Sequence, residues 1–218
     1  MSEPSQTDAM SEKIEKLMTH LSVTRKGAQR IAEIVEAGVE ILLEEGFTAL
    51  TKRRIAKRLG IGHGNVSYYF PTREALWQAV IEYELKAYYD KHYQGFESDP
   101  DDAQGCFDEF VRFWFEEYED REMRIFFAQV LAFAEVKDVV AKQRDAIYEM
   151  FFEESLSRMR PLNLGVSEEV LRERAMFLMA TLEGMHAVTA FRPELVHDNA
   201  KFKKRVVEHM NAIVRGKL

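Results

Sequence analysis

The chain has 218 residues, of which 46% are hydrophobic and 11% aromatic, and this composition excludes an intrinsically disordered protein. Cys106 is the only cysteine, which excludes an intrachain disulfide and a cysteine-based zinc site. The longest nearly uncharged apolar run, residues 125–134, is too short to span a bilayer, and the polar start of the chain has no apolar secretion signal. We therefore expect a globular cytoplasmic protein with no membrane partner.

The net charge of −7 is unevenly distributed along the chain. Residues 25–77 contain nine Lys or Arg against six Glu, a net charge of +3, so the remainder carries −10. Residues 97–122 alone hold eleven Asp or Glu against Arg112 and Arg121. A basic segment on an acidic protein directs that segment toward nucleic acid and repels the remainder from it.

The sequence predicts an all-α fold of about nine helices, because 3.6-residue periodicity recurs and no stretch shows strand alternation bounded by hairpin turns. Residues 1–24 are interpreted as a polar, partly disordered leader. Residues 25–71 are predicted to form a three-helix head, and residues 72–218 a larger helical body. The predicted helices, in chain order, are residues 25–45, 51–59, about 63–70, 72–93, 103–119, 121–134, 137–160, 167–191 and 198–215.

Residues 51–76 predict two short helices on either side of a glycine turn, with six Lys or Arg and a single acidic residue, Glu74. Thr51 is placed to cap the first helix, and Gly60 is placed to end it. The second helix is expected to begin near His63. This arrangement is typical of a helix-turn-helix unit that binds DNA.

The second of these helices is expected to bury Val66 and Phe70 and to expose short polar and aromatic side chains. Such side chains suit contacts with base edges in a major groove, while cations on the preceding helix suit contacts with phosphates. The exposed residues of the second helix are His63, Asn65, Ser67 and Tyr69, and the basic residues of the first are Lys52, Arg53, Arg54, Lys57 and Arg58.

Residues 55–61, the Tyr-Tyr-Phe run at 68–70 and the Thr-Arg-Glu-Ala-Leu run at 72–76 together resemble the DNA-binding domain of TetR-type regulators. The resemblance covers about residues 25–80 in detail. It implies a DNA-binding head, a body with a small-molecule site, and a homodimer. Ser67 departs from the aromatic residue common at this place in the family, so the resemblance does not specify the operator. The DNA-binding residues expected from the motif are Thr51, Lys52, Arg53, His63, Gly64, Asn65, Ser67, Tyr68, Tyr69, Thr72 and Arg73.

The predicted helix over residues 167–191 has two apolar faces. One face can pack on the core of its own subunit, so the other must be buried elsewhere, for example in a four-helix contact between two subunits. The alternative is that both faces lie in the core of one subunit. The first face comprises Leu171, Ala175, Leu178, Leu182 and Met185. The residues expected at the dimer interface are Phe177, Ala180, Gly184, Ala187, Phe191, Phe202, Val206 and Met210.

The body is rich in aromatic residues and methionine, most of which the core requires. Side chains of these types also form adaptable pockets for apolar or aromatic ligands, and the resemblance implies a small-molecule site among the helices after residue 103. Arg124, Gln129 and Thr181 are polar residues beside apolar ones and are candidate polar anchors for a ligand, and His186 is interpreted as a residue of the interface or of the pocket wall. The residues expected to line the pocket are Phe110, Trp114, Arg124, Phe127, Tyr148, Phe151, Phe152, Met176 and Thr181.

The leading hypothesis is a ligand-responsive transcription regulator, expected to be a repressor, that binds a pseudo-palindromic DNA operator as a homodimer. A small apolar or aromatic effector would release it. The alternative is a helical protein-interaction module whose basic head binds an acidic partner without reading DNA sequence. An enzyme is not expected, because no Ser-His-Asp, Cys-His or metal-ligand constellation is present in the sequence, and no cofactor or metal is expected.

Overall fold

The structure is a computed structural model that describes residues 25–92, 101–117, 120–196 and 199–217; the predicted leader lies outside this part of the chain. The described residues form nine α-helices of seven residues or more and no strand, which confirms the predicted fold class. No described helix is long and apolar enough to cross a membrane. The longer helices are α2 (Arg25–Glu45), α3 (Lys52–Leu59), α4 (His63–Tyr69), α5 (Arg73–His92), α6 (Ala103–Glu117), α7 (Arg121–Ala134), α8 (Asp138–Met159), α9 (Glu168–Thr189) and α11 (Ala200–Val214), and the short elements are η1 (Phe47–Ala49), η3 (Arg160–Leu162) and α10 (Pro193–Val196).

These helices group into two compact units. The first unit contains α2 to α5 together with residues 125–146, and the second contains α6, residues 120–124 and the residues from 147 onward. Helices α7 and α8 therefore each contribute residues to both units. The domain boundary predicted at residue 71 was placed where the helix-turn-helix motif ends. The two units are defined by contacts between residues, so this boundary stays a prediction.

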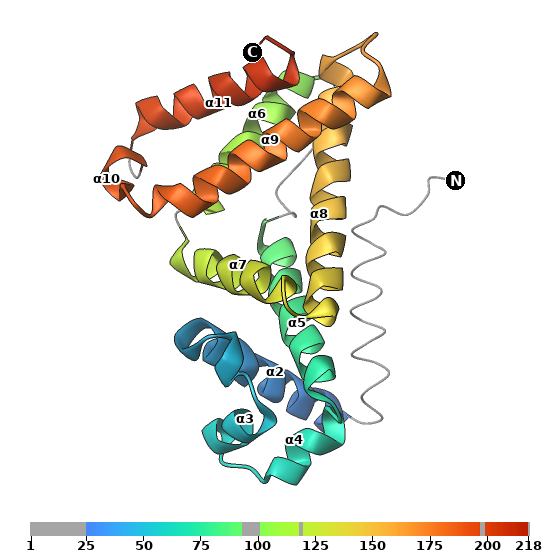
Figure 1. The fold of residues 1–218 in the computed structure, drawn as a ribbon, viewed down its shortest axis with the longest axis vertical. Helices are drawn as coiled ribbons and strands as arrows, with labels where there is room; N and C mark the ends of the chain where they lie inside the picture. The colour runs from blue at the N-terminus through green and yellow to red at the C-terminus, as the bar shows by residue number, and fades with distance from the viewer. Residues whose placement is uncertain (1–24, 93–100, 118–119, 197–198, 218) are drawn as a thin grey trace. The chain divides into compact units, whose positions relative to one another are not determined.

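Helix α2 organises the first unit because its apolar residues recur at helical spacing and cover one face. Ile34, Ile41 and Leu42 on that face are completely buried. Gly38 allows α2 and α5 to approach closely, since a Cβ atom added there would lie 2.5 Å from the side chain of Val80. The core of the first unit therefore holds α3 and α5 beside α2, and α4 packs on α3 (Figure 1).

The part of α7 that belongs to the first unit packs on the same core. The buried ring of Phe47 stacks on Phe133 of α7, with ring centroids 4.3 Å apart, and meets Trp77 of α5 edge-on at 5.1 Å. The indole N–H of Trp77 donates to the carbonyl of Leu50 at 3.2 Å. Aromatic pairs in these geometries add to the burial of the rings and fix their orientation.

In the second unit, α9 and α11 lie side by side, and α11 also packs on α6 (Figure 1). The guanidinium of Arg174 on α9 donates to the side-chain oxygen of Asn163 at 3.1 Å and to the carbonyl of Val214 at 3.0 Å. This arginine therefore ties α9 to the end of α11. The first predicted face of α9 is buried at Leu171, Ala175, Leu178 and Leu182.

Candidate nucleic-acid interface

Local interactions position α3 and α4, the two helices of the helix-turn-helix unit, which we call the reading unit. The Thr51 hydroxyl accepts a hydrogen bond from the backbone N–H of Arg54 at 3.2 Å, which caps α3 as predicted. Gly60 follows α3 with φ of 66°, a left-handed conformation that favours glycine, and the N–H of Ile61 then donates to the carbonyl of Ala56 at 3.0 Å. The chain thus leaves α3 through a tight turn and enters α4 at His63.

Helix α4 presents one face to solvent and the other to the core. Val66 and Phe70 are buried, as the pattern predicted. His63, Gly64 and Asn65 are exposed, and Tyr68 leaves 79% of its surface in solvent.

The polar face of α4 is also ordered by contacts among its own side chains. Ser67 Oγ lies 3.5 Å from His63 Nδ1, and the rings of Tyr68 and Tyr69 meet edge-on at 5.0 Å. Ser67 and Tyr69 were predicted to be exposed but are half-buried. This face offers hydrogen-bonding groups and aromatic edges in a form suited to base and phosphate contacts. Contact of these residues with DNA stays a prediction.

Several of the predicted contact residues also hold the unit together. Lys52 Nζ donates to the carbonyl of Pro71 at 2.7 Å, and the Thr72 hydroxyl accepts from the N–H of Ala75 at 3.0 Å. The guanidinium of Arg73 donates to the carbonyl of Thr48 at 3.0 Å and lies 4.6 Å from the centre of the Trp77 ring. These residues lie at the edges of the reading unit, where a side chain can serve both the fold and a phosphate contact.

Arg54 and Arg58 form ion pairs within the protein. Both were expected among the cations that face phosphates, but the structure pairs them with carboxylates of α2. Arg54 Nη2 lies 2.7 Å from Glu45, and Arg58 lies 3.0 Å from Glu40 and 2.5 Å from Glu44. The hydrogen bond from Arg54 lowers the pKa of Glu45 below its usual value.

The cations left on the outer side of α3 are Arg53 and Lys57, which are both exposed. In the described part of the chain, no ion pair engages either of them. Since their charges are available to solvent, these two residues suit phosphate contacts better than Arg54 and Arg58 do.

The second predicted face of α9 is exposed in the single chain. Phe177 on α9 is 68% exposed, and Phe191, which lies two residues beyond the end of α9, is 77% exposed, although both are large and apolar. Ala180, Gly184 and Ala187 between them are also exposed. An apolar stripe of this kind on the surface of one chain indicates an interaction site.

Two of the residues predicted at the dimer interface are buried within the single chain. Val206 and Met210 of α11 are 6% and 1% exposed, because α11 turns them toward its own unit and its charged residues toward solvent. Phe202 is half-buried, with its ring 5.8 Å from that of Phe115. Met176 and Val188 of α9 and Leu195 of α10 are also exposed apolar residues near this stripe, and the pattern did not assign them to it.

The predicted pocket residues divide into two groups. The rings of Trp114 and Phe151 in the second unit meet edge-on, with their centroids 4.3 Å apart. The centroid of the Phe110 ring lies 6.2 Å from that of Trp114. Trp114 and Phe151 line a cavity of about 10 Å³ together with Ser155, Met179, Leu182 and Glu183. A cavity of this size holds about one water molecule, so a larger ligand would have to widen it.

The remaining predicted residues do not line this cavity, although Tyr148 donates a hydrogen bond to Glu183, which does. Met176 is 59% exposed on the surface of α9. The Thr181 hydroxyl donates to the carbonyl of Phe177 at 2.7 Å within its own helix, and the ring of Phe152 lies 5.5 Å from the guanidinium of Arg172. Phe127 belongs to the first unit.

The sequence reasoning missed Glu183, the charged member of the cavity lining. Burial raises the pKa of Glu183 above its usual value, and a hydrogen bond from Tyr148 opposes that rise. Burial also lowers the pKa of His186, whose ring interacts with Arg124. The feature of the sequence that could have indicated Glu183 is its position one residue after Leu182, a core residue of α9, within an otherwise apolar stretch. Within the described residues, no group of three or more His, Cys, Asp or Glu could hold a metal ion.

The helix-turn-helix region of the chain matches a known protein family. Residues 34–80 match the family model described as bacterial regulatory proteins of the tetR family. This match runs from the middle of α2 through α3 and α4 into α5. A search among curated proteins finds no match.

Solved structures resemble the whole described fold. A TetR transcription regulator from Haloarcula marismortui aligns with a TM-score of 0.67 at 16% identity, over 86% of this chain and 97% of its own. A putative transcriptional regulator from Saccharomonospora viridis, in complex with choline, gives 0.65 at 15% identity over 86% and 96%. The multidrug binding protein EbrR, complexed with proflavin, gives 0.57 at 17% identity over 84% and 99%. These likenesses establish the fold.

Proposed function

We propose that this chain is a TetR-family transcriptional regulator, of which two copies bind a pseudo-palindromic operator and release it when a small molecule enters the second unit. The observation that supports this proposal most strongly is the solvent-exposed polar face of α4, which is held on a buried core by a capped helix and a glycine turn. A rigid reading helix reduces the entropy lost when DNA is bound.

In this proposal α4 enters the major groove. Asn65 and Ser67 contact base edges, because short polar side chains near the start of a recognition helix can hydrogen-bond to bases. Arg53 and Lys57 contact phosphates, which fixes the position of the head on the duplex without reading sequence. Release of condensed counterions by these cations makes the affinity depend on salt.

We propose that the second copy covers the exposed stripe of α9. Phe177 and Phe191 supply apolar area. Gly184 between them faces open space in the single chain, and because it has no side chain it would permit close approach of the partner. A two-fold pairing would place the same stripe on both subunits. Two heads would then contact half-sites about 34 Å apart, or one turn of DNA.

The effector is proposed to be a small apolar or aromatic molecule held among the rings of Trp114 and Phe151. The indole N–H of Trp114 is buried and has no hydrogen-bond partner among the described residues. Glu183 adds a carboxyl group to the same cavity. Both polar groups could orient a ligand. The solved relatives in complex with choline and with proflavin support a ligand that joins apolar surface to a polar or charged group.

Helix α7 supplies a route from effector to DNA. Residues 121–124 of α7 belong to the second unit, and residues 125–134 belong to the first. The first-unit part is fastened to the head through Gln129 and Phe133. A ligand that binds more tightly to a conformation with displaced α7 would therefore lower the affinity for DNA.

The proposal is tested by selecting bound duplexes from a random pool with the wild-type chain and with Asn65→Ala. We expect the wild type to enrich one palindromic sequence. Asn65→Ala should relax the preference at one position per half-site, at a cost of about 1 to 3 kcal/mol for a lost base contact. Binding without sequence enrichment would contradict the proposal and favour an interaction module with a basic head.

A further inference from the structure

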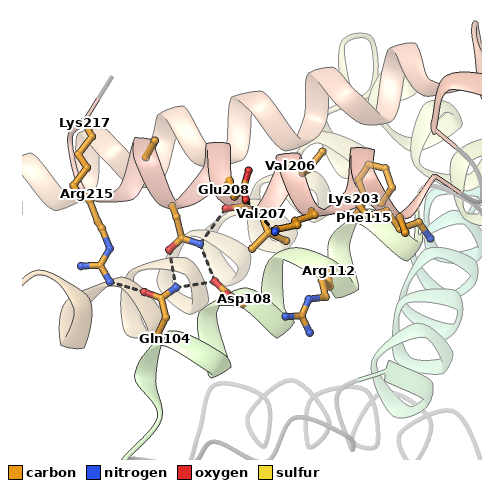
Figure 2. A pocket seen from close by; sticks show the side chains of 14 residues that line it. Gln104, Asp108, Arg112, Phe115, Lys203, Val206, Val207, Glu208, Arg215 and Lys217 are labelled. Carbon is orange, nitrogen blue, oxygen red and sulfur yellow. Dashed lines mark hydrogen bonds and ion pairs between the residues drawn. The ribbon is translucent and has the colours of Figure 1, made fainter.

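A second concave surface lies between α6 and α11, away from the cavity of Trp114 and Glu183. It is an open groove of about 850 Å³ (Figure 2). Sites for small molecules in proteins have volumes of about 300 to 1,000 Å³, so the α6–α11 groove has the size of a ligand site. Neither the DNA-binding head nor the stripe of α9 contributes residues to it.

The wall of the groove is apolar near its middle. Phe115 of α6 and Val206 of α11 line it and are otherwise buried, and Val207 lies one residue farther along α11. The ammonium group of Lys203 is 5.7 Å from the centre of the Phe115 ring. A positive charge therefore lies beside the apolar part of the groove wall.

Hydrogen bonds between the two helices fix the other end of the groove. The Gln104 amide donates to Asp108 and to Asn211 at 2.7 Å each, and the Asn211 amide donates to Asp108 at 2.7 Å (Figure 2). The carboxylate of Asp108 thus accepts from two amides. Because these bonds connect α6 to α11, the groove is formed before any ligand arrives, which reduces the cost of binding.

The charge of the groove has the opposite sign to that of the chain as a whole. Its lining contains five Lys or Arg against two carboxylates, in a protein with a net charge of −7. One carboxylate, Asp108, is engaged by amides, and the other, Glu208, lies 3.8 Å from Lys204. Among the described residues, no hydrogen bond or ion pair engages the guanidinium of Arg112. The five cations are Arg112, Lys203, Lys204, Arg215 and Lys217.

We propose that the α6–α11 groove binds an amphipathic anion, a molecule with an apolar chain or ring that ends in a carboxylate. The apolar part packs against Phe115, Val206 and Val207, and the carboxylate lies between Arg112 and Lys203. Burial of the apolar part supplies affinity, and the excess of cations in the lining selects an anion over a cation of the same shape.

Isothermal titration of the full chain with decanoate, in the absence of DNA, tests this site independently of operator binding. Decyltrimethylammonium serves as the probe of opposite charge and equal chain length. We expect decanoate to bind and the cation to bind more weakly. Arg112→Glu and Lys203→Glu should each raise the dissociation constant for decanoate about tenfold, because each places a like charge beside the carboxylate.

Two further variants make the result specific to the groove. Lys201→Glu makes the same charge change on an exposed part of α11 outside the groove and should leave the dissociation constant unchanged. Val207→Trp should weaken binding by filling the groove without changing its charge. The proposal is overturned if decanoate does not bind, if the cation binds equally well, or if the groove variants bind decanoate as the wild type does. It is also overturned if Lys201→Glu weakens binding as much as Lys203→Glu.

Discussion

The backbone N–H of Phe47 donates a hydrogen bond of 3.0 Å to the side-chain oxygen of Gln129, which lies 82 residues later on α7. The same Phe47 ring stacks on Phe133, one helical turn farther along α7. A polar contact and an aromatic contact therefore attach α7 to the segment that precedes α3. A displacement of α7 would therefore also displace Phe47 in the segment that precedes α3.

Removing the Gln129 acceptor should weaken this attachment. Gln129→Met keeps a side chain of similar length but leaves the Phe47 N–H without a partner, which costs about 1 to 3 kcal/mol for a buried donor. Gln129→Glu keeps an acceptor oxygen and should retain more of the stability. Urea unfolding measures both. Equal stability of Gln129→Met and the wild type would show that the hydrogen bond does not hold α7 to the head.

Arg53 and Arg58 should respond differently to alanine substitution, although both lie on α3. Arg53→Ala removes an exposed cation and should lower the slope of log affinity against log salt by about 1, with similar losses on all DNA sequences. Arg58→Ala removes the partner of three α2 carboxylates and should lower the stability of the head while leaving the salt slope unchanged.

Fluorescence anisotropy at several salt concentrations separates these outcomes. If Arg58→Ala lowers the slope as much as Arg53→Ala, Arg58 leaves its carboxylates to bind a phosphate. A changed base preference in Arg53→Ala with an unchanged slope would mean that Arg53 reads bases.

The contrast between these arginines shows what the sequence could and could not predict. Thr51 and Gly60 were assigned correctly because a cap and a left-handed turn depend on residues within a few positions. The burial of Val66 and Phe70 followed from helical spacing. The partners of Arg58 lie 13 to 18 residues away on another helix, and periodicity carries no information about such tertiary pairs.

The candidate sites in the second unit were harder to predict for a related reason. Periodicity identified two faces on α9, but it could not show which apolar residues of α11 are buried in the single chain, so the burial of Val206 and Met210 was not predicted. Glu183 was missed because a carboxylate on a helix is usually at the surface. Its burial depends on the side chains that surround it, such as Trp114 and Phe151.

The stability of the chain should depend on the ionisation of Glu183. Burial raises its pKa above the ordinary value of 4.5, so between these two pKa values the folded chain binds more protons than the unfolded chain does. The stability contributed by the protonated carboxyl is therefore fully present below about pH 4.5 and is lost as the pH rises through the raised pKa.

Glu183→Gln removes this ionisation and should raise the melting temperature at pH 7 relative to the wild type, with a smaller effect at low pH. Glu173→Gln, an exposed carboxyl on the same helix, is the control and should have little effect at either pH. Thermal unfolding followed by circular dichroism at several pH values measures the difference. A Glu183→Gln variant that is no more stable than the wild type at pH 7 would show that the carboxyl is not penalised by burial.

Gly184→Leu should separate the subunits without unfolding them. In the single chain a side chain at Gly184 has open space, so each subunit can accommodate leucine. In the proposed dimer the same leucine would overpack the contact between two α9 helices, at a cost of about 1 to 3 kcal/mol, and symmetry repeats the change. Light scattering should report a monomer with normal helical content. A folded dimer of unchanged stability would show that the stripe of α9 does not face the partner.

The most direct test of a dimer that reads two half-sites is the effect of spacing within the selected operator. Operator affinity is measured for the wild-type chain on the selected duplex, on a duplex with one half-site scrambled, and on a duplex with about five base pairs inserted between the half-sites, half of a turn of about 10 base pairs. We predict that scrambling and insertion both reduce the affinity by at least about a hundredfold, because only one α4 can then reach its half-site. Equal affinity for the three duplexes would contradict the paired reading of DNA by two copies of α4.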